Sequence, residues 1–261
     1  MQQMQEFSIH THTKIGDGYD TVEDMILEAK RSGLKTLGIS DHFWAVSYDL
    51  PNYVKAIRAA QDKLQFDVLI GLEIDNPSDD RLEMLYKIKK EYGFDYFIGS
   101  LHDVPYNGKK YYVGSKEDKN ILQSQTYQQT YWQTLPNLAN DLFDIIAHMD
   151  LIKLTGVKTE ALYEADIDKA LKAFKANNQI IEINTKHHQI ENEPSDTILA
   201  KVAKADIPVI FSSDAHIKHQ LIQHFAEEQR RLAEPLAKMR YISKSDELRQ
   251  FLQSRHGPRT K

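Results

Sequence analysis

The chain has 261 residues, with 33 Lys and Arg against 38 Asp and Glu, for a formal net charge of -5. This mildly acidic balance argues against a protein that binds nucleic acid or anionic membranes through a basic face. The composition includes 11 His but 0 Cys, so disulfides and thiolate ligands are excluded and any metal site must use nitrogen and oxygen donors.

Short apolar runs alternate with amphipathic stretches along most of the chain, which is typical of strand and helix units around a parallel sheet. Each run is rich in Ile, Val, Leu or aromatic residues and is apolar on both faces, as in fully buried parallel strands. In chain order, the predicted strands are Phe7–His10, Lys35–Ser40, Val68–Leu72, Tyr96–Ser100, Phe143–Ala147, Ile180–Ile183 and Pro208–Ser212.

Amphipathic helices are predicted between these strands. The first has a clear start signal, because Thr21 followed three residues later by Asp24 fits a capping box. The predicted helices are Thr21–Ser32, Asn52–Leu64, Asp80–Tyr92, Ser124–Leu138, Thr159–Ala176 and Ser195–Ala205. Seven strand and helix units of this kind favour an α/β barrel over an open doubly wound sheet.

Residues 217–261 are predicted to form a C-terminal helical region. It contains a long polar helix over Gln220–Leu236, a short strand over Met239–Ile242 and a final helix over Ser243–Ser254. Since neither a repeat nor a low-complexity linker interrupts the chain, we expect a single domain over residues 1–261. We also expect a cytoplasmic protein, because no basic and apolar leader begins the sequence and no apolar run approaches about 18 residues.

Six histidines and three acidic residues lie just after predicted strands, all at the same end. They are His10, His12, His42, His102, His148 and His216, with Asp17, Glu73 and Asp214. In barrels and in open α/β sheets, ligands bind at the carboxyl ends of the strands. We therefore expect these side chains to converge on one rim.

The spacing of these residues indicates a metal site. His10 and His12 are separated by one residue on extended backbone, which places both imidazoles on one face about 7 Å apart, and Asp214 and His216 have the same spacing. One transition metal takes four to six ligands, so the nitrogen and oxygen donors present fit two or three ions with bridging carboxylates. A lone His at a strand end is more often a capping or core residue, but many together are costly to bury without bound cations.

The ordered blocks resemble the polymerase and histidinol phosphatase (PHP) family. The resemblance covers residues 7 to 216 and is closest to the histidinol-phosphate phosphatase branch. The blocks are His10-Thr11-His12-Thr13, Ser40-Asp41-His42, Gly71-Leu72-Glu73, Gly99-Ser100-Leu101-His102, Ala147-His148-Met149-Asp150-Leu151-Ile152 and Ser213-Asp214-Ala215-His216.

The resemblance implies a distorted seven-stranded, TIM-like (β/α)7 barrel with a trinuclear centre of zinc, iron or manganese that hydrolyses phosphate monoesters. The positions that match the family's metal ligands are the nine His and acidic residues named above, including Asp17 at a position where members carry Asp or His. The branch further implies L-histidinol phosphate as substrate, within histidine biosynthesis.

Residues outside the ligand set depart from this pattern. Relatives in the branch tend to place an Arg-containing loop after the sixth strand, whereas this chain has Lys186, His187 and His188 there. We expect Lys186 and Lys153 to bind the substrate phosphate, with His187 beside them, although a solvated surface position is an open alternative for each Lys. Lys supplies a point charge but lacks the bidentate fork of Arg. Asp103, directly after His102, adds an anion that the pattern does not explain.

The expected reaction is attack on phosphorus by a water that the metal ions activate. The leaving group is expected to be protonated by an acid at the rim, either Asp214 or His216, or by metal-bound water. Asp41 is expected to orient His42 or a neighbouring ligand. Trp44 is expected either to form a wall of the substrate pocket or to pack against the fold.

Three other functions are compatible with parts of this pattern. One is a PHP phosphoesterase that acts on a nucleotide, a sugar phosphate or phosphotyrosine; another is a metal-dependent amidohydrolase. The third is a metal-binding scaffold without activity, which the complete ligand set disfavours. The expected partner is a small phosphate monoester, with neither nucleic acid nor membrane, and the sequence does not predict an oligomeric state.

Overall fold

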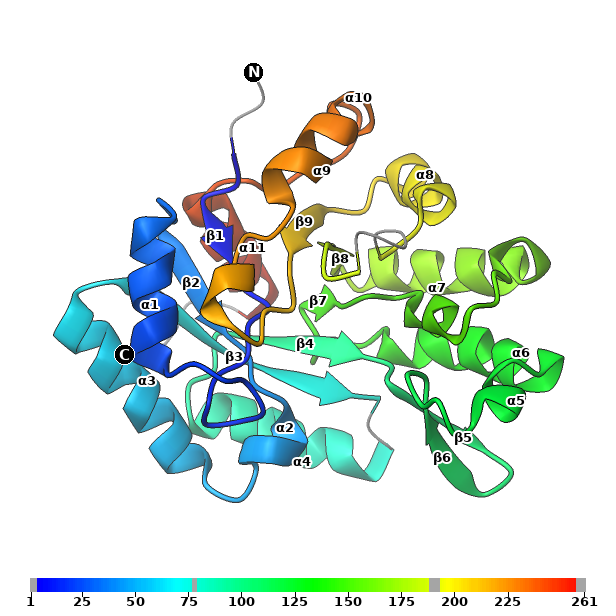
Figure 1. The fold of residues 1–261 in the computed structure, drawn as a ribbon, viewed down its shortest axis with the longest axis horizontal. Coiled ribbons are helices and arrows are strands. Elements are labelled where there is room, and N and C mark those ends of the chain that lie inside the picture. The colour runs from blue at the N-terminus through cyan, green and yellow to red at the C-terminus, as the bar shows by residue number, and fades with distance from the viewer. Residues whose placement is uncertain (1–3, 77–78, 188–192, 257–261) are drawn as a thin grey trace.

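A computed structural model describes residues 4–76, 79–187 and 193–256 of the chain (Figure 1). Seven parallel strands form one sheet in the order β1-β2-β3-β4-β7-β8-β9. Each of these strands therefore pairs with the one of the seven that precedes or follows it along the chain. They are β1 Phe7–Ser8, β2 Thr36–Ile39, β3 Asp67–Asp75, β4 Tyr96–Ser100, β7 Ile145–Ile146, β8 Ile180–Asn184 and β9 Val209–Ser212. This confirms the seven predicted strands.

The sheet curls into a nearly closed barrel. Its first and last strands meet through a parallel bridge between Thr11 and Ala215, where the His12 N–H donates to the Ala215 carbonyl over 2.8 Å. This contact brings the residues that follow β1 against those that follow β9. The barrel prediction is therefore confirmed, and the open doubly wound sheet is excluded.

Helices cover the outside of the barrel (Figure 1). The longer ones are α1 Val22–Arg31, α3 Leu50–Leu64, α4 Asp79–Glu91, α6 Gln125–Thr134, α7 Glu164–Ala176 and α8 Asp196–Ala205; two short ones are α2 Phe43–Val46 and α5 Lys119–Leu122. The predicted capping box is present at α1, where Thr21 Oγ1 accepts from the Asp24 N–H and the Asp24 carboxylate accepts from the Thr21 N–H.

A β-hairpin that the sequence analysis did not predict follows β4. Its strands are β5 Asp103–Tyr106 and β6 Lys109–Tyr112. The turn is Asn107-Gly108, whose φ angles of 50° and 77° are those that a tight hairpin turn requires. The hairpin begins immediately after His102, so it lies against the rim where the predicted ligands gather.

The C-terminal region differs from the prediction. The expected helix Gln220–Leu236 is broken into a 3₁₀ turn Lys218–Gln220, α9 Phe225–Arg231 and α10 Ala233–Leu236. His224 adopts a left-handed φ of 62°, and Pro235 has no N–H to continue the hydrogen-bond ladder of α9. The expected strand Met239–Ile242 is also wrong, since only Tyr241 forms a single bridge, to Val209.

The last helix, α11 Ser245–His256, covers the amino-terminal end of the barrel. Leu248, Phe251 and Leu252 join the buried cluster formed by side chains of the strands. Polar contacts join the helix to residues that precede strands, because Glu6 accepts from the Ser245 N–H and Arg255 donates to Asp144 over 2.9 Å. The opposite end of the barrel is left open for a site.

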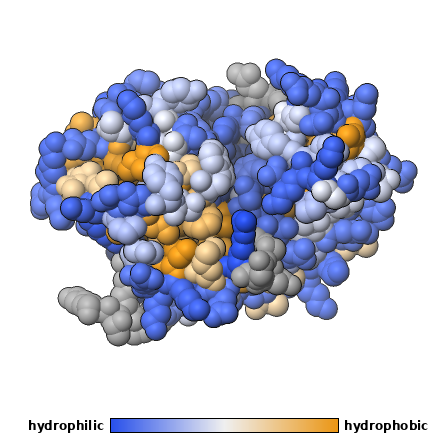
Figure 2. All heavy atoms as spheres, turned by 90° about the horizontal axis from the view of Figure 1, so that it is seen from below, coloured by the Kyte–Doolittle hydropathy of each residue, from blue (hydrophilic) through white to orange (hydrophobic). Residues whose placement is uncertain are grey.

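The face shown in Figure 2 is mostly hydrophilic, and its hydrophobic residues gather mainly in the left half and centre of the view. Among the residues that the structure describes, no helix is both long and apolar enough to span a bilayer.

Candidate metal centre

The structure brings all nine predicted ligands together at the carboxyl ends of the strands, around Glu73 at the end of β3. Glu73 Oε2 lies 3.2 Å from His10 Nε2 and 3.4 Å from His12 Nε2. Its other oxygen, Oε1, lies 3.0 Å from His148 Nε2 and 3.6 Å from His102 Nε2. The two oxygens of one carboxylate therefore face two separate groups of imidazoles.

Asp214 completes the first of these groups. Its Oδ1 lies 3.1 Å from His12 Nε2 and 3.6 Å from His10 Nε2. Asp214 has a φ of 47° and His148 a φ of 25°, both in a region that non-Gly residues rarely adopt. Strained backbone of this kind concentrates at functional sites, where it aims a side chain that a relaxed chain would direct elsewhere.

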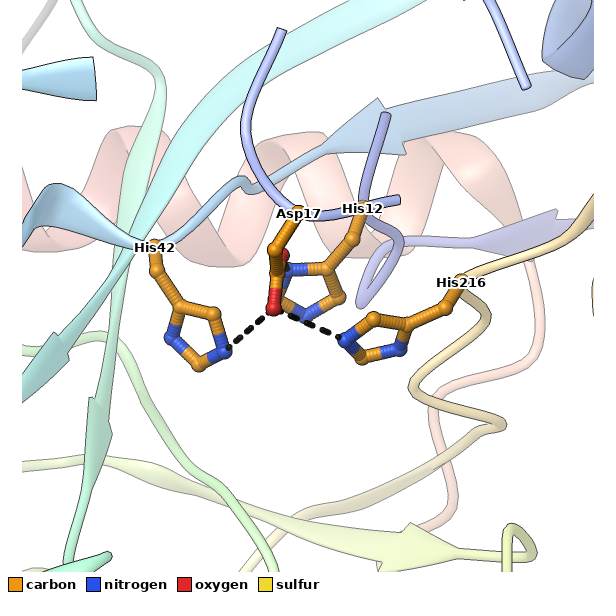
Figure 3. A group of neighbouring side chains, drawn as sticks. All are labelled: His12, Asp17, His42 and His216. Carbon is orange, nitrogen blue, oxygen red and sulfur yellow. Dashed lines mark ion pairs between the residues drawn. The ribbon is translucent and has the colours of Figure 1, made fainter. Parts of the chain in front are cut away.

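A third group surrounds Asp17 at the outer edge of the cluster (Figure 3). Asp17 Oδ2 lies 3.4 Å from His216 Nε2 and 3.7 Å from His42 Nε2. His12 connects this group with the first, because its Nδ1 lies 3.4 Å from Asp17 Oδ1 while its Nε2 faces Glu73. The Asp17 side chain is 31% exposed and that of His216 20%, so the third group is the most exposed of the three.

The donor atoms fit divalent transition metals. Buried polar atoms that have no hydrogen-bond partner include His10 Nε2, both ring nitrogens of His12, Glu73 Oε2 and Asp214 Oδ1. Such atoms are costly to bury unless something compensates them. Donors about 2.1 Å from a shared tetrahedral ion lie roughly 3.4 Å apart, which is close to the separations in each group. Cations at these positions would satisfy the orphaned atoms.

The electrostatics of the cluster is set by opposite charges in a buried place. Burial would raise the pKa of Glu73, but His42, His10 and His102 hold that pKa well below its usual value. Burial likewise opposes ionisation of Asp214, yet Lys186 and the neighbouring imidazoles keep its pKa far below the ordinary range. The carboxylates are therefore ionised and available as ligands near neutral pH.

Glu182 is a functional residue that the sequence analysis missed. It lies within β8, is 0% exposed, and its Oε1 accepts from His10 Nδ1 over 2.6 Å. Its Oε2 accepts from the His148 N–H over 2.8 Å. The bond between Glu182 Oε1 and His10 Nδ1 fixes the His10 ring with Nε2 toward Glu73. Carboxylate partners of metal-binding histidines commonly do this. The available signal was a Glu in the middle of an apolar, buried strand.

We expect Glu182→Gln to weaken metal binding about 10–100-fold, because the neutral amide no longer polarises His10 or favours the tautomer that presents Nε2. The measurement is competition with a chelating dye, with circular dichroism to check folding. Glu164→Gln, the same change of charge at the exposed start of α7, is the control. Equal metal affinity in the Glu182→Gln and Glu164→Gln proteins would show that Glu182 has no such role.

Asp75 orients the imidazole of another ligand, His102, as Glu182 orients that of His10. Its Oδ1 accepts from His102 Nδ1 over 2.7 Å and from the His102 N–H over 3.0 Å. Asp75 follows Glu73 by two residues on β3, so both side chains lie on the same face of the strand. That period of two was the signal that could have identified it.

Of the two expected roles of Asp41, the structure shows no hydrogen bond to His42 among the described residues, and Asp41 acts instead on neighbouring ligands. It is 0% exposed and accepts from the N–H and the hydroxyl of Thr13, over 2.5 and 2.8 Å. These bonds fix the turn between His12 and Asp17, and so position two ligands through the backbone. Burial is the main cause that raises the pKa of Asp41 to about 6.

A pocket of about 390 Å³ opens beside the cluster. Trp44 lines the pocket and stacks on His42, with ring centroids 5.4 Å apart. Of the two positions expected for Trp44, the structure thus shows the one in the pocket wall. Lys186 also lines the pocket and donates to Asp214 Oδ2 over 2.8 Å. Asp103 also lines the pocket, and burial together with Asp75 raises its pKa by more than Lys110 and His102 lower it.

The other predicted substrate contacts are placed differently. Lys153 is buried, lies 3.4 Å from Asp150 and is not among the residues that line the pocket. His187 Nδ1 lies 3.3 Å from Glu193, also away from the pocket lining. His188 lies outside the described residues. Of the expected phosphate contacts, the structure brings only Lys186 to the pocket.

A family model described as "PHP domain" matches residues 6–186. The chain belongs to the PHP domain family. This membership agrees with the fold and with the order of the ligand-bearing blocks along the chain, from His10 after β1 to His148 after β7.

Several proteins are similar to this PHP chain. One from Deinococcus radiodurans, named "Probable histidinol-phosphatase", is 26% identical over 238 residues, covering 84% of this chain and 89% of that protein. One from Clostridium acetobutylicum, named a probable phosphatase, is 29% identical over 225 residues, covering 80% of this chain and 78% of that protein.

A solved structure shares the fold. It is the histidinol phosphate phosphatase of Lactococcus lactis, in complex with zinc, L-histidinol and phosphate. The TM-score is 0.71 at 16% identity, with 89% of this chain and 94% of that chain covered. The likeness establishes the same barrel architecture for both PHP chains.

Proposed function

We propose that this protein is a metal-dependent phosphomonoester hydrolase that converts L-histidinol phosphate and water to L-histidinol and phosphate, using three divalent ions of zinc, iron or manganese. Membership of the PHP family and the names of the similar proteins support the phosphatase reaction. The ligand complex of the Lactococcus lactis protein supports this substrate and the use of zinc.

The observation that carries the proposal is the arrangement of donors around Glu73 beside an open pocket. Asp17 and Asp214 line this pocket, and Glu73 lies buried within 3.4 Å of His12 behind them, so these carboxylates alone would repel a phosphate dianion. The same donors satisfy the requirements of divalent cations, and bound cations would reverse the sign of the local field. This composition therefore favours a metal centre as the binding site of an anionic substrate.

The groups assign ligands to each ion. His10, His12, Glu73 and Asp214 would hold the first; Glu73, His102 and His148 the second; and Asp17, His42 and His216 the third. Bound divalent ions supply the charge that holds phosphate oxygens and the acidity that turns water into a nucleophile. Glu182 and Asp75 keep two of the imidazoles in the orientation that binding requires.

Lys186 is the proposed phosphate-binding cation. Its ammonium lies at the pocket wall, where it can bind a phosphate oxygen while Asp214 holds it in place. Lys153 and His187 do not serve this purpose in our proposal, because each has an acidic partner away from the pocket.

Neither of the two predicted acids, Asp214 and His216, is free to protonate the leaving group in our proposal. Asp214 has a pKa far below its usual value and therefore stays ionised when the leaving oxygen needs a proton. His216 lies on the pocket wall, with its Nδ1 3.3 Å from Lys186 Nζ and 3.0 Å from the Asp214 carbonyl oxygen. Its Nε2 would hold the third ion, so its remaining N–H would be too weak an acid, and in our proposal the proton comes from a water at the site.

The test is phosphate release by the metal-loaded protein from L-histidinol phosphate, an aryl phosphate, a nucleotide, phosphotyrosine and several sugar phosphates. We expect kcat/KM for L-histidinol phosphate to exceed the others by at least about 10²-fold, because hydrogen-bonding sites reject analogues that leave their polar groups unpaired. Elemental analysis of the same sample should find transition metal, and chelation should remove activity that added metal restores. Full turnover by metal-free protein, or preference for another ester, would contradict the proposal.

A further inference from the structure

The outer wall of the pocket carries a carboxylate that the metal centre does not use. Asp103 lines the pocket, and within the described part of the chain no hydrogen bond or ion pair engages its side chain. The neighbouring Asp75 is occupied by His102, so Asp103 is the carboxylate that remains available. A free anion at the mouth of a phosphate site weakens phosphate binding by repulsion, unless another part of the substrate is positive.

The hairpin β5–β6 fixes where this carboxylate points. Asp103 begins β5 and is directly opposite Tyr112 at the end of β6, so the two side chains lie on the same face of the hairpin. The Tyr112 ring lies 6.3 Å from that of His102. The hairpin thus presents a carboxylate and an aromatic ring together, next to a metal ligand.

Trp44 supplies an aromatic surface on another part of the wall. Trp44 belongs to α2, the short helix that begins directly after His42. Its side chain stacks on the His42 ring and is still 63% exposed. The rings of His42 and His102 lie 5.3 Å apart, so Trp44 and Tyr112 border the pocket beside neighbouring ligands. Exposed aromatic faces bind flat rings and cations.

We propose that Asp103 binds the ammonium group of the leaving alcohol, and so restricts the substrate to phosphate esters of cationic amino alcohols, with Trp44 and Tyr112 contacting a flat ring. The assignment rests on the proposed function, since it concerns the same pocket. The metal centre binds the anionic end of such an ester and Asp103 binds the cationic end, which orients the substrate along the pocket. Lys110 influences the carboxylate from the same hairpin but forms no ion pair with it among the described residues.

The experiment compares two esters that differ only in the amine: L-histidinol phosphate and its deamino analogue, which keeps the imidazole. The ratio of their kcat/KM values is measured for the metal-loaded wild type, Asp103→Asn, Asp103→Glu and Glu117→Gln. The last variant removes one negative charge from an exposed position downstream of the hairpin. Calorimetric binding of L-histidinol and of deamino histidinol is measured on the same proteins.

We expect Asp103→Asn to lower the ratio about tenfold, the effect of losing one charge-assisted hydrogen bond, mainly through a higher KM for the amine ester. Asp103→Glu should restore part of the ratio, and Glu117→Gln should keep the wild-type ratio. A ratio that Asp103→Asn leaves unchanged would overturn the assignment while phosphatase activity stands. If the wild type hydrolyses neither ester but binds L-histidinol in an Asp103-dependent way, the proposed function fails and the amine site stands.

Discussion

Glu73→Gln should lose its bound metal and at least about 10³-fold in kcat/KM, roughly 4 kcal/mol of transition-state stabilisation. Glu73 is the residue that joins the groups of donors, since Oε2 faces His10 and His12 while Oε1 faces His148. The neutral amide offers one oxygen in place of two and carries no charge. Metal content by elemental analysis and steady-state kinetics on L-histidinol phosphate are the measurements.

The control for this variant is Glu83→Gln. Glu83 is exposed on α4, where it pairs with Lys87, so its substitution changes the net charge by the same amount far from the ligands. It should retain wild-type metal content and turnover. A Glu73→Gln protein that keeps its full metal complement and wild-type kcat/KM would exclude Glu73 as a shared ligand.

Asp144→Ala should lower the free energy of unfolding by about 3–5 kcal/mol, the usual cost of removing one partner from a buried ion pair. Asp144 is 0% exposed, just before β7, and it accepts from Lys89, Arg255, His256 and the Phe97 N–H. The substitution leaves the cations buried without their anion and releases the end of α11. Urea unfolding is the measurement.

The contribution of Asp144 also depends on pH. Burial alone would raise its pKa, but Lys89, His256 and Arg255 outweigh burial and lower it to about 2. Because the pKa is lower in the folded than in the unfolded state, the stabilisation is present above about pH 4 and is lost as the pH falls toward 2.

The difference in unfolding free energy between wild type and Asp144→Ala should therefore shrink over that interval. Asp141→Ala, at an exposed neighbouring position, should change stability by less than about 0.5 kcal/mol. A difference from wild type that is constant from pH 5 to pH 2 would contradict this account.

The ligands could be predicted from the sequence because their positions follow from strand ends. Parallel strands that end at one rim bring His10, His42 and His148 together whatever the loops do, and each strand was recognisable by its apolar run. Glu182 and Asp75 were missed because a charged residue inside a buried strand signals a partner without indicating which ligand that partner is. Its role depends on which side chain lies opposite in the neighbouring strands.

The residues on loops were the hardest to place. Lys153 follows His148 in a basic position, but a 3₁₀ turn over Leu151–Thr155 turns it toward Asp150 and away from the pocket. Asp41 is adjacent to His42 in sequence, yet it bonds to Thr13 on another segment. The first contact depends on the local 3₁₀ turn and the second on the path of another loop, and neither follows from the position of the residue after its strand.

The hairpin β5–β6 separates substrate choice from metal binding within one barrel. Among the strands that the structure describes, its two strands pair with each other and with no other, and it packs on α6 through Tyr111, whose carbonyl accepts from the Tyr127 hydroxyl. Its sequence can therefore change without altering the register of the seven parallel strands that position the ligands. Exchanging this ten-residue segment between relatives is a direct route to new leaving-group preferences on an unchanged metal scaffold.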